Sequence, residues 1–310
     1  MGLTRCGHRV YRHAAFHDLA HACPARIQRA PSLPTEGLGS ETHDRLPPTR
    51  CLASADAYER YVGRWSRLVA RDFLAWLAVP QGGRWLDVGC GSGALTETII
   101  RVAAPASVLG IDPSADFLAR AQAALAGERV TFERGDAEAI PVPDDAFDAV
   151  VVGLVLNFVR DPDRALAEAR RVARAGGFVG AYVWDYGGEM QMMRRFWDAA
   201  VALDPGAHEL DEGFRFPIAR PAALAALFGR AGLVDVDTRA IDIPTRFVDF
   251  EDFWEPSLGG QAPAPAYLIS LPPAGREALR DRIRATLPIA ADGSINLVAR
   301  AWAVRGREPG

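Results

Sequence analysis

Short apolar runs alternate with helical segments through the middle of this 310-residue chain. The expected strands cover residues 84–88, 107–111, 130–134, 147–156 and 177–184. The expected helices between them cover residues 93–103, 114–126 and 161–174. The strands are apolar along nearly their whole length, which is typical of a parallel sheet covered by helices on both faces. We therefore predict a doubly wound α/β domain whose ligands bind beyond the carboxyl ends of its strands.

The first 52 residues differ from the rest of the chain. They hold five of the six histidines and show little helical or strand periodicity, so we expect a disordered or loosely packed extension. Residues 53–310 are expected to form the folded domain. An amphipathic helix is predicted over residues 54–79, with a break at Gly63 and its end at Pro80.

Two segments interrupt the later part of the domain, at about residues 185–219 and 243–294. A helix and then a strand are expected between them, over residues 220–243, and a last strand over residues 295–304. Connections this long in a compact domain are usually functional or disordered, so we expect the two segments to form a lid of helices and loops. The first segment holds three of the four methionines. Its Met and aromatic residues, with Phe253, Trp254 and Tyr267 from the second, suggest a lid over an apolar or aromatic small molecule.

Composition excludes several classes of function. A net charge of -4 gives no basic field, so we predict neither nucleic-acid binding nor attraction to a membrane surface. No apolar run approaches the roughly 20 residues of a membrane span, which favours a cytoplasmic protein. The cysteines and histidines match no zinc-binding spacing, so no metal site is expected. All 35 basic residues are Arg, which excludes a Schiff-base lysine.

A glycine-rich loop follows the first expected strand in "WLDVGCGSGALTE". Gly89, Gly91 and Gly93 have the spacing of loops that bind S-adenosylmethionine (SAM), although a looser dinucleotide-binding pattern also matches. Asp87 lies two residues before the first glycine. A carboxylate there would oppose a pyrophosphate, whereas it suits the cationic amino group of a methionine moiety.

Two further acids follow the next strands. Asp112 ends the second strand, where a carboxylate can accept hydrogen bonds from both ribose hydroxyls of either type of cofactor. Asp136 follows the third strand and could accept a hydrogen bond from the adenine amine, with the backbone N–H of Ala137 directed at a ring nitrogen. A simple turn role is the alternative for Asp136.

These motifs resemble a known family when they are taken in order. "LDVGCGSG", "GIDPS", "GDAEAIPVPDDAFDAVVV" and "ARAGGFVGAYVWDY" are similar to the successive motifs of class I SAM-dependent methyltransferases, in particular the methyltransferase type 11 group. The resemblance implies a seven-stranded, mostly parallel sheet with an antiparallel last strand, and SAM bound at the glycines, Asp112, Asp136 and Ala137. It also implies that Tyr61 and Arg64, in "YVGRWSR", approach the methionine carboxylate.

The acceptor side carries a weaker signal. Asn157 follows the fourth strand and could orient an acceptor hydroxyl or carbonyl, or it could bond its own loop. His208 is the one histidine outside the first 52 residues, so it is a candidate general base, with a solvated surface position as the alternative. We predict a SAM-dependent methyltransferase with a small-molecule acceptor. An NAD(P)-dependent oxidoreductase and a protein that binds SAM or S-adenosylhomocysteine without methyl transfer are the alternatives.

Overall fold

The structure is a computed structural model that describes residues 59–125, 127, 129–260 and 262–310. The predicted extension over residues 1–52, and the start of the predicted helix over 54–79, lie outside the described residues. Within the described part, the predicted break at Gly63 is a change of helix type, because Gly63 has right-handed helical angles and the helical backbone continues through it. A π-helical turn, η1 (Glu59–Gly63), is followed by α2 (Arg64–Leu77), which ends where Ala78 adopts a left-handed conformation.

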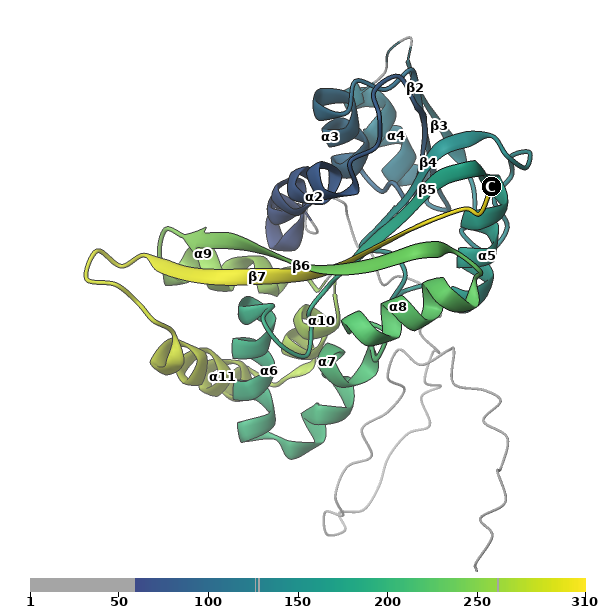
Figure 1. The fold of residues 1–310 in the computed structure, drawn as a ribbon. Helices are drawn as coiled ribbons and strands as arrows, with labels where there is room; N and C mark the ends of the chain where they lie inside the picture. The colour runs from purple at the N-terminus through teal and green to yellow at the C-terminus, as the bar shows by residue number, and fades with distance from the viewer. Residues whose placement is uncertain (1–58, 126, 128, 261) are drawn as a thin grey trace, which may run out of the picture. The chain divides into compact units, whose positions relative to one another are not determined.

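The core of the fold is a seven-stranded sheet in the order β3-β2-β1-β4-β5-β7-β6. The strands are β1 (Arg84–Val88), β2 (Ser107–Asp112), β3 (Val130–Arg134), β4 (Phe147–Gly153), β5 (Ala173–Trp184), β6 (Val234–Phe247) and β7 (Ile295–Arg307). Strands β1 to β5 pair in parallel, and β7 is antiparallel to both β5 and β6. This topology, visible in Figure 1, confirms the predicted doubly wound sheet with an antiparallel last strand.

Helices cover both faces of the sheet, which explains why the parallel strands are apolar throughout. Helices α2, α3 (Ala94–Val102) and α4 (Ala115–Leu125) lie on one face, and α5 (Pro162–Val172) and α8 (Pro221–Arg230) lie on the other (Figure 1). The expected cap of α5 is present, because the Asp161 carboxylate accepts a hydrogen bond from the Arg164 N–H at 3.0 Å. Among the described residues, no helix is long and apolar enough to span a membrane.

Several strand boundaries differ from the prediction. β2 ends one residue later, at Asp112, and β5 begins at Ala173 rather than at residue 177. β4 ends at Gly153 rather than at residue 156, because Leu154 turns the chain with a φ of 61°. β6 continues to Phe247 because residues 238 to 247 remain paired with β7 without interruption. The second inserted segment therefore begins at about residue 248 rather than 243.

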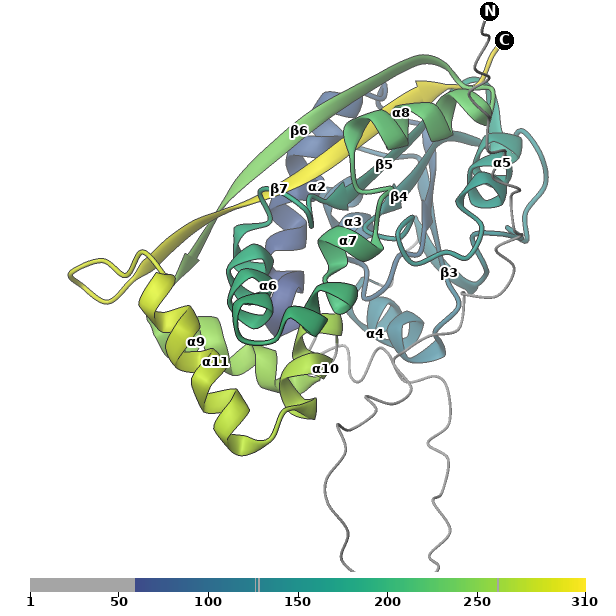
Figure 2. The same ribbon diagram turned by 90° about the horizontal axis from the view of Figure 1, so that it is seen from below.

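The two inserted segments are largely helical. The first contains α6 (Gln191–Leu203), the 3-10 helix η2 (Pro205–Leu210) and α7 (Glu212–Arg215). The second contains α9 (Phe250–Trp254), the 3-10 helix η3 (Glu255–Gly259), α10 (Pro263–Ser270) and α11 (Pro273–Thr286). The segments lie side by side in Figure 2, and the rings of Trp197 and Tyr267 join them at 5.7 Å. We call these two segments the cover.

Candidate active site

The glycine loop lies at the carboxyl end of β1. Gly89, Gly91 and Gly93 all have positive φ values, of 72°, 52° and 93°, which glycine adopts without strain. A Cβ atom at Gly89 would collide with Val155, and one at Gly93 would lie 2.7 Å from Leu125 Cδ1. A Cβ at Gly91 would meet nothing within 4 Å. Packing therefore requires the outer two glycines, while the backbone at Gly91 faces open space that a ligand can fill.

A carboxylate stands beside that open space. Asp112 Oδ2 accepts a hydrogen bond from the Gly91 N–H at 3.0 Å, and Oδ1 accepts one from the Ser114 N–H at 2.8 Å. Burial raises the pKa of Asp112. The bare backbone at Gly91 and the adjacent carboxylate suit a neutral ribose, which donates hydrogen bonds, better than a pyrophosphate, which would bring further negative charge.

Asp87 lies beneath this loop, with only 1% of its surface exposed. Its Oδ2 accepts a hydrogen bond from Thr96 Oγ1 at 2.6 Å, which links β1 to the first turn of α3. Burial, together with the nearby charge of Asp112, raises the pKa of Asp87 to about 7. In this arrangement the Asp87 side chain is enclosed in the protein interior. The predicted attraction for the amino group of a ligand would therefore act through the loop, from beneath it.

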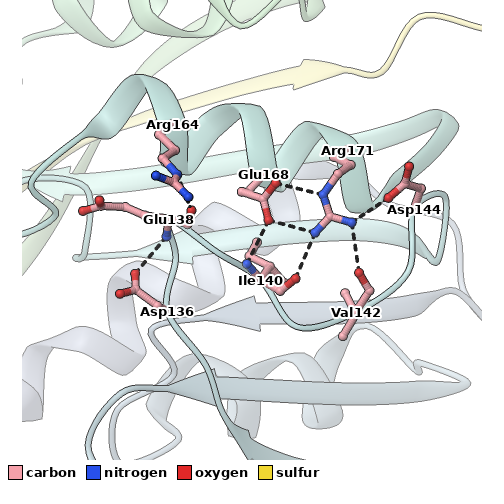
Figure 3. A network of polar contacts seen from close by, with 8 residues as sticks. All are labelled: Asp136, Glu138, Ile140, Val142, Asp144, Arg164, Glu168 and Arg171. Carbon is pink, nitrogen blue, oxygen red and sulfur yellow. Dashed lines mark hydrogen bonds and ion pairs between the residues drawn. The ribbon is translucent and has the colours of Figure 1, made fainter.

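Asp136, shown in Figure 3, and Ala137 lie in the loop between β3 and β4. Asp136 is exposed and its Oδ1 accepts a hydrogen bond from the Glu138 N–H at 2.9 Å, so it does have the alternative role of a turn residue. Ala137 is partly buried. The contacts of Asp136 and Ala137 with adenine stay a prediction.

Side chains of α5 fasten this loop to the sheet (Figure 3). Arg171 donates hydrogen bonds to the carbonyls of Ile140 and Val142 at 2.9 and 3.0 Å. Glu168 accepts one from the Ile140 N–H at 2.9 Å, and the Arg171 guanidinium beside it holds the Glu168 pKa below its usual range. Sequence reasoning missed these contacts, although Glu168 and Arg171 are three residues apart, a spacing that places two side chains on the same face of a helix.

A small cavity lies beyond the carboxyl ends of β4 and β5. Its volume is about 30 Å³, enough for about one water molecule. Its lining comes from the sheet, η1 and both parts of the cover: Tyr61, Val62, Leu154, Phe158, Trp184, Tyr186, Met193, Glu212, Ala262 and Pro263. The cavity adjoins the glycine loop, because Gly89 packs against Val155 and the neighbouring Leu154 lines the cavity.

A larger cavity, of about 260 Å³, lies at the opposite edge of the sheet, beside Phe178 and Arg305. Phe178 lies near the start of β5, whereas ligands of such sheets bind beyond the strand ends. No predicted site residue lines this larger cavity. The small cavity is therefore the better candidate for the acceptor site.

Tyr61 and Arg64, which were predicted together, point to different surroundings. Tyr61 is buried and lines the small cavity, and burial raises its pKa well above the usual value. The Arg64 guanidinium forms an ion pair with Asp252 at 2.8 Å and lies over the rings of Trp65 and Phe247. It is thereby held against β6 and α9, and in this arrangement it does not line the cavity.

The two predicted acceptor-side residues are also separated. Asn157 is 8% exposed, and its Nδ2 donates to the hydroxyl of Tyr186 at 3.4 Å. Its Oδ1 is buried without a hydrogen-bond partner among the described residues. His208 is exposed on η2, with its ring 4.6 Å from that of Phe214, and it does not line the cavity. The structure thus brings Asn157 towards the cavity through Tyr186 and leaves His208 outside it.

Sequence reasoning missed Glu212, the first residue of α7. Glu212 is one of the residues that line the cavity, is 2% exposed and accepts a hydrogen bond from Trp197 Nε1 at its carboxylate. Burial raises its pKa to about 7. In "LDEGF" this residue looks like one more acid of a polar loop, and only the fold of the cover shows that it is enclosed. Among the described residues, no cluster of His, Cys, Asp or Glu is suited to a metal ion.

Comparisons with known proteins agree with this geometry. The family model described as a methyltransferase domain matches residues 86–180. The chain is 32% identical over 185 residues to a demethylmenaquinone methyltransferase of Roseiflexus castenholzii, which covers 55% of this chain and 76% of that protein. It is 30% identical over 190 residues to a ubiquinone/menaquinone biosynthesis C-methyltransferase of Desulfotalea psychrophila, which covers 56% and 73%.

Solved structures share the fold at low sequence identity. The YcgJ protein of Bacillus subtilis superimposes with a TM-score of 0.53 at 16% identity, over 78% of this chain and 99% of that one. A phosphoethanolamine N-methyltransferase of Haemonchus contortus, solved with S-adenosylhomocysteine, gives 0.53 at 17% identity, over 82% and 57%. With the family match and the relatives above, they show that this chain belongs to the class I SAM-dependent methyltransferases and is an enzyme that uses SAM as its methyl donor.

Proposed function

We propose that the small cavity beyond β4 and β5 receives an aromatic acceptor that carries an acidic hydroxyl group, such as a reduced quinone. The lining of the cavity carries this proposal. It is mostly aromatic and apolar, and the polar side chains among its residues are those of Tyr61, Tyr186 and Glu212 and the indole N–H of Trp184, which is buried without a hydrogen-bond partner among the described residues. Apolar walls bind a ring, and a few converging polar groups orient its substituents.

The names of the relatives support the same class of acceptor. Besides the two quinone-pathway enzymes above, a 2-phytyl-1,4-naphthoquinone methyltransferase of Synechococcus elongatus is 36% identical over 115 residues, 36% of this chain and 49% of that protein. Each name describes the relative, and the aromatic lining extends the idea to this chain. The alternatives of NAD(P)-dependent oxidation and of SAM binding without transfer are not favoured by these relatives.

For the methyl donor, we assign the ribose to Asp112, the close backbone approach to Gly91, and the adenine to Asp136 and Ala137. The Asp112 carboxylate already accepts a hydrogen bond from the Gly91 N–H, so this one group would hold both the loop and the ribose in place. Asp87, Gly89 and Gly93 support the loop from beneath and from its two sides. We leave Arg64 out of this set because its guanidinium pairs with Asp252.

When bound, SAM supplies an electrophilic methyl group on a sulfonium, which is a good leaving group. The protein then has to hold the acceptor in line with the methyl carbon and exclude water. A cavity of about 30 Å³ is too small for an aromatic ring. We therefore infer that α7 and the start of α10 separate to admit the acceptor and close again before transfer.

Transfer of radiolabelled methyl from SAM to a small panel of acceptors tests this proposal. The panel contains 1,4-dihydroxynaphthalene kept under reducing conditions, 2-naphthol, and phosphoethanolamine as a non-aromatic amine control. We expect label on the dihydroxynaphthalene, and mass spectrometry with NMR of the product distinguishes a ring methyl from a methyl ether. Label on phosphoethanolamine alone would contradict an aromatic acceptor. Binding of SAM without transfer to any of the three compounds would favour the non-catalytic alternative.

A further inference from the structure

We propose that Glu212 is the general base that takes the proton from the acceptor hydroxyl. This inference rests on the proposed aromatic acceptor and adds a residue and a chemical role to it. Glu212 is the one acidic residue in the lining of the small cavity, to which Tyr61 and Tyr186 also contribute, and its charge acts on the Tyr61 hydroxyl. An acceptor held between the strand ends and the cover would therefore place its hydroxyl within reach of this carboxylate.

The position of Glu212 is fixed from outside the cavity. Its Oε2 accepts a hydrogen bond from the Trp197 indole N–H, which ties α7 to α6. The preceding residue, Asp211, forms a bidentate ion pair with Arg194 at 2.6 and 2.7 Å. Arg194 also donates to the carbonyl of Tyr186 at 2.9 Å. Helix α6, helix α7 and the end of β5 are thus locked together around one carboxyl group.

The charges around Glu212 suit a base that works near neutral pH. Burial is the main cause that raises its pKa to about 7, and the charge of Asp211 adds to it. The Trp197 hydrogen bond and the charges of Arg215 and Arg194 act in the opposite direction. Glu212 in turn helps to raise the pKa of Tyr61 across the cavity. A base with a pKa near the working pH combines an available ionised form with a useful proton affinity.

The step balances with the groups present in the reaction. The acceptor O–H proton moves to the Glu212 carboxylate, and the electron pair that it leaves increases the density on the oxygen and the ring. The acceptor atom bonds to the methyl carbon while the carbon–sulfur bond breaks, and its electron pair stays on sulfur as a neutral thioether. The proton then passes from Glu212 to solvent when the cover opens. If the methyl group was added to a ring carbon, that carbon loses its hydrogen as a proton and the oxygen regains a proton, which restores the hydroxyl.

The other candidates lack one of these properties. Asn157 has an amide, which does not take a proton near neutral pH. His208 is exposed and outside the cavity. Asp87 has a similarly raised pKa but is enclosed beneath the glycine loop, where its carboxylate accepts a hydrogen bond from Thr96 Oγ1.

The test compares Glu212→Gln with Glu209→Gln. The first change keeps the shape of the side chain and an oxygen for the Trp197 N–H, and the second removes an exposed carboxyl on η2. With 1,4-dihydroxynaphthalene as acceptor, we expect kcat/KM of the unmodified enzyme to rise with pH through about 7. Glu212→Gln should lower kcat by about 10²–10⁴-fold and abolish that rise, with S-adenosylhomocysteine affinity unchanged. Glu209→Gln should behave like the unmodified enzyme.

Infrared difference spectra between about pH 5 and pH 9 give a readout that needs no turnover. The band of the protonated carboxyl should lose intensity in steps near neutral pH from both Asp87 and Glu212. One step should disappear in Glu212→Gln and remain in Glu209→Gln. A spectrum without any contribution from Glu212 in this range would overturn the proposal.

The kinetic outcomes separate the inference from the function beneath it. If the unmodified enzyme methylates the naphthalene and Glu212→Gln retains its rate and pH profile, Glu212 is not the base although the proposed function stands. If the variant loses S-adenosylhomocysteine binding together with activity, its role is structural and the inference is wrong. If the unmodified enzyme binds S-adenosylhomocysteine but methylates no hydroxylated ring, the proposed acceptor class fails and the inference fails with it.

Discussion

The donor side and the acceptor side of this enzyme are built in different ways. In our proposal, the donor side is formed at the carboxyl ends of β1, β2 and β3, by the glycine loop, Asp112 and the turn of Asp136. The proposed acceptor side lies where two inserted helical segments meet the ends of β4 and β5. Its functional groups are side chains that the chain brings together from distant positions.

This difference separates what the family shares from what sets this chain apart. A bare backbone with one carboxylate can bind the same donor in many proteins, because little besides glycine fits there. A cavity that is walled by long side chains changes with each substitution, so it determines which acceptor is methylated. Substitutions in the cover should therefore change the acceptor preference and leave the donor site intact.

The largest expected effect is on the stability of the cover. Arg194→Leu leaves the buried carboxylate of Asp211 without its partner, which costs about 3–5 kcal/mol. Arg230→Leu removes an exposed ion pair with Asp163 and is the matched control, with an expected cost of about 1 kcal/mol or less. Chemical denaturation of both variants measures the difference. Equal losses of stability would show that the Arg194 pair does not hold the cover together.

A somewhat smaller effect should appear in the pH dependence of stability. Asp87 and Glu212 both have a folded-state pKa of about 7, raised chiefly by burial. Because the folded pKa is above the unfolded one, each group stabilises the fold most below its unfolded pKa. That stability, about 3–4 kcal/mol for each group as an upper limit, is lost as the pH rises through about 7.

Thermal unfolding at about pH 5 and pH 8.5 tests this sign with Asp87→Asn and Glu212→Gln. Each variant should lose less stability than the unmodified enzyme when the pH is raised, and the double variant should lose least. The opposite result would be an unmodified enzyme that becomes more stable as the pH rises over this range, with a smaller rise in the variants. It would mean that both acids are better stabilised as carboxylates than their burial implies.

On the donor side, Gly91→Ala should weaken SAM binding by about a hundredfold, or about 2.7 kcal/mol. Its added methyl would occupy the open space of the loop. Gly82→Ala is the control, because Gly82 also has a positive φ, of 80°, with nothing within 4 Å of the added Cβ. Both changes carry the same kind of backbone strain, so calorimetric titration with SAM isolates the effect of the space itself. Equal affinities would place the ligand elsewhere.

Much of the fold could be predicted from the sequence, because local signals and packing agree there. Strand and helix periodicity located β1, β2 and β3 almost to the residue, and the Asp161 cap located the start of α5. β6 was predicted too short, because its later residues gain their partner from β7, about 50 positions further along the chain. A pairing between such distant residues gives no signal in the sequence around the end of β6.

The site was predictable to a lesser degree. The glycines and Asp112 lie together as expected, because the glycines follow β1 and Asp112 ends the neighbouring strand β2. Arg64 was chosen from the family resemblance and His208 by residue type. In the structure Arg64 is ion-paired with Asp252, and His208 is exposed on η2. Glu212 was missed because its burial depends on Trp197 and on the fold of the cover, which no pattern near residue 212 reveals.

The central claim is that the carboxylate of Asp112 and the bare backbone beside it hold a sulfur nucleoside. Titration of the purified enzyme with SAM, S-adenosylhomocysteine and NAD, repeated on Asp112→Ala and on Asp163→Ala as a surface control, tests it most directly. We expect both sulfur nucleosides to bind, NAD to bind weakly or not at all, and Asp112→Ala alone to lose at least tenfold, about 1.4 kcal/mol. Binding of NAD alone, or SAM affinity that is unchanged in Asp112→Ala, would contradict this account of the donor site.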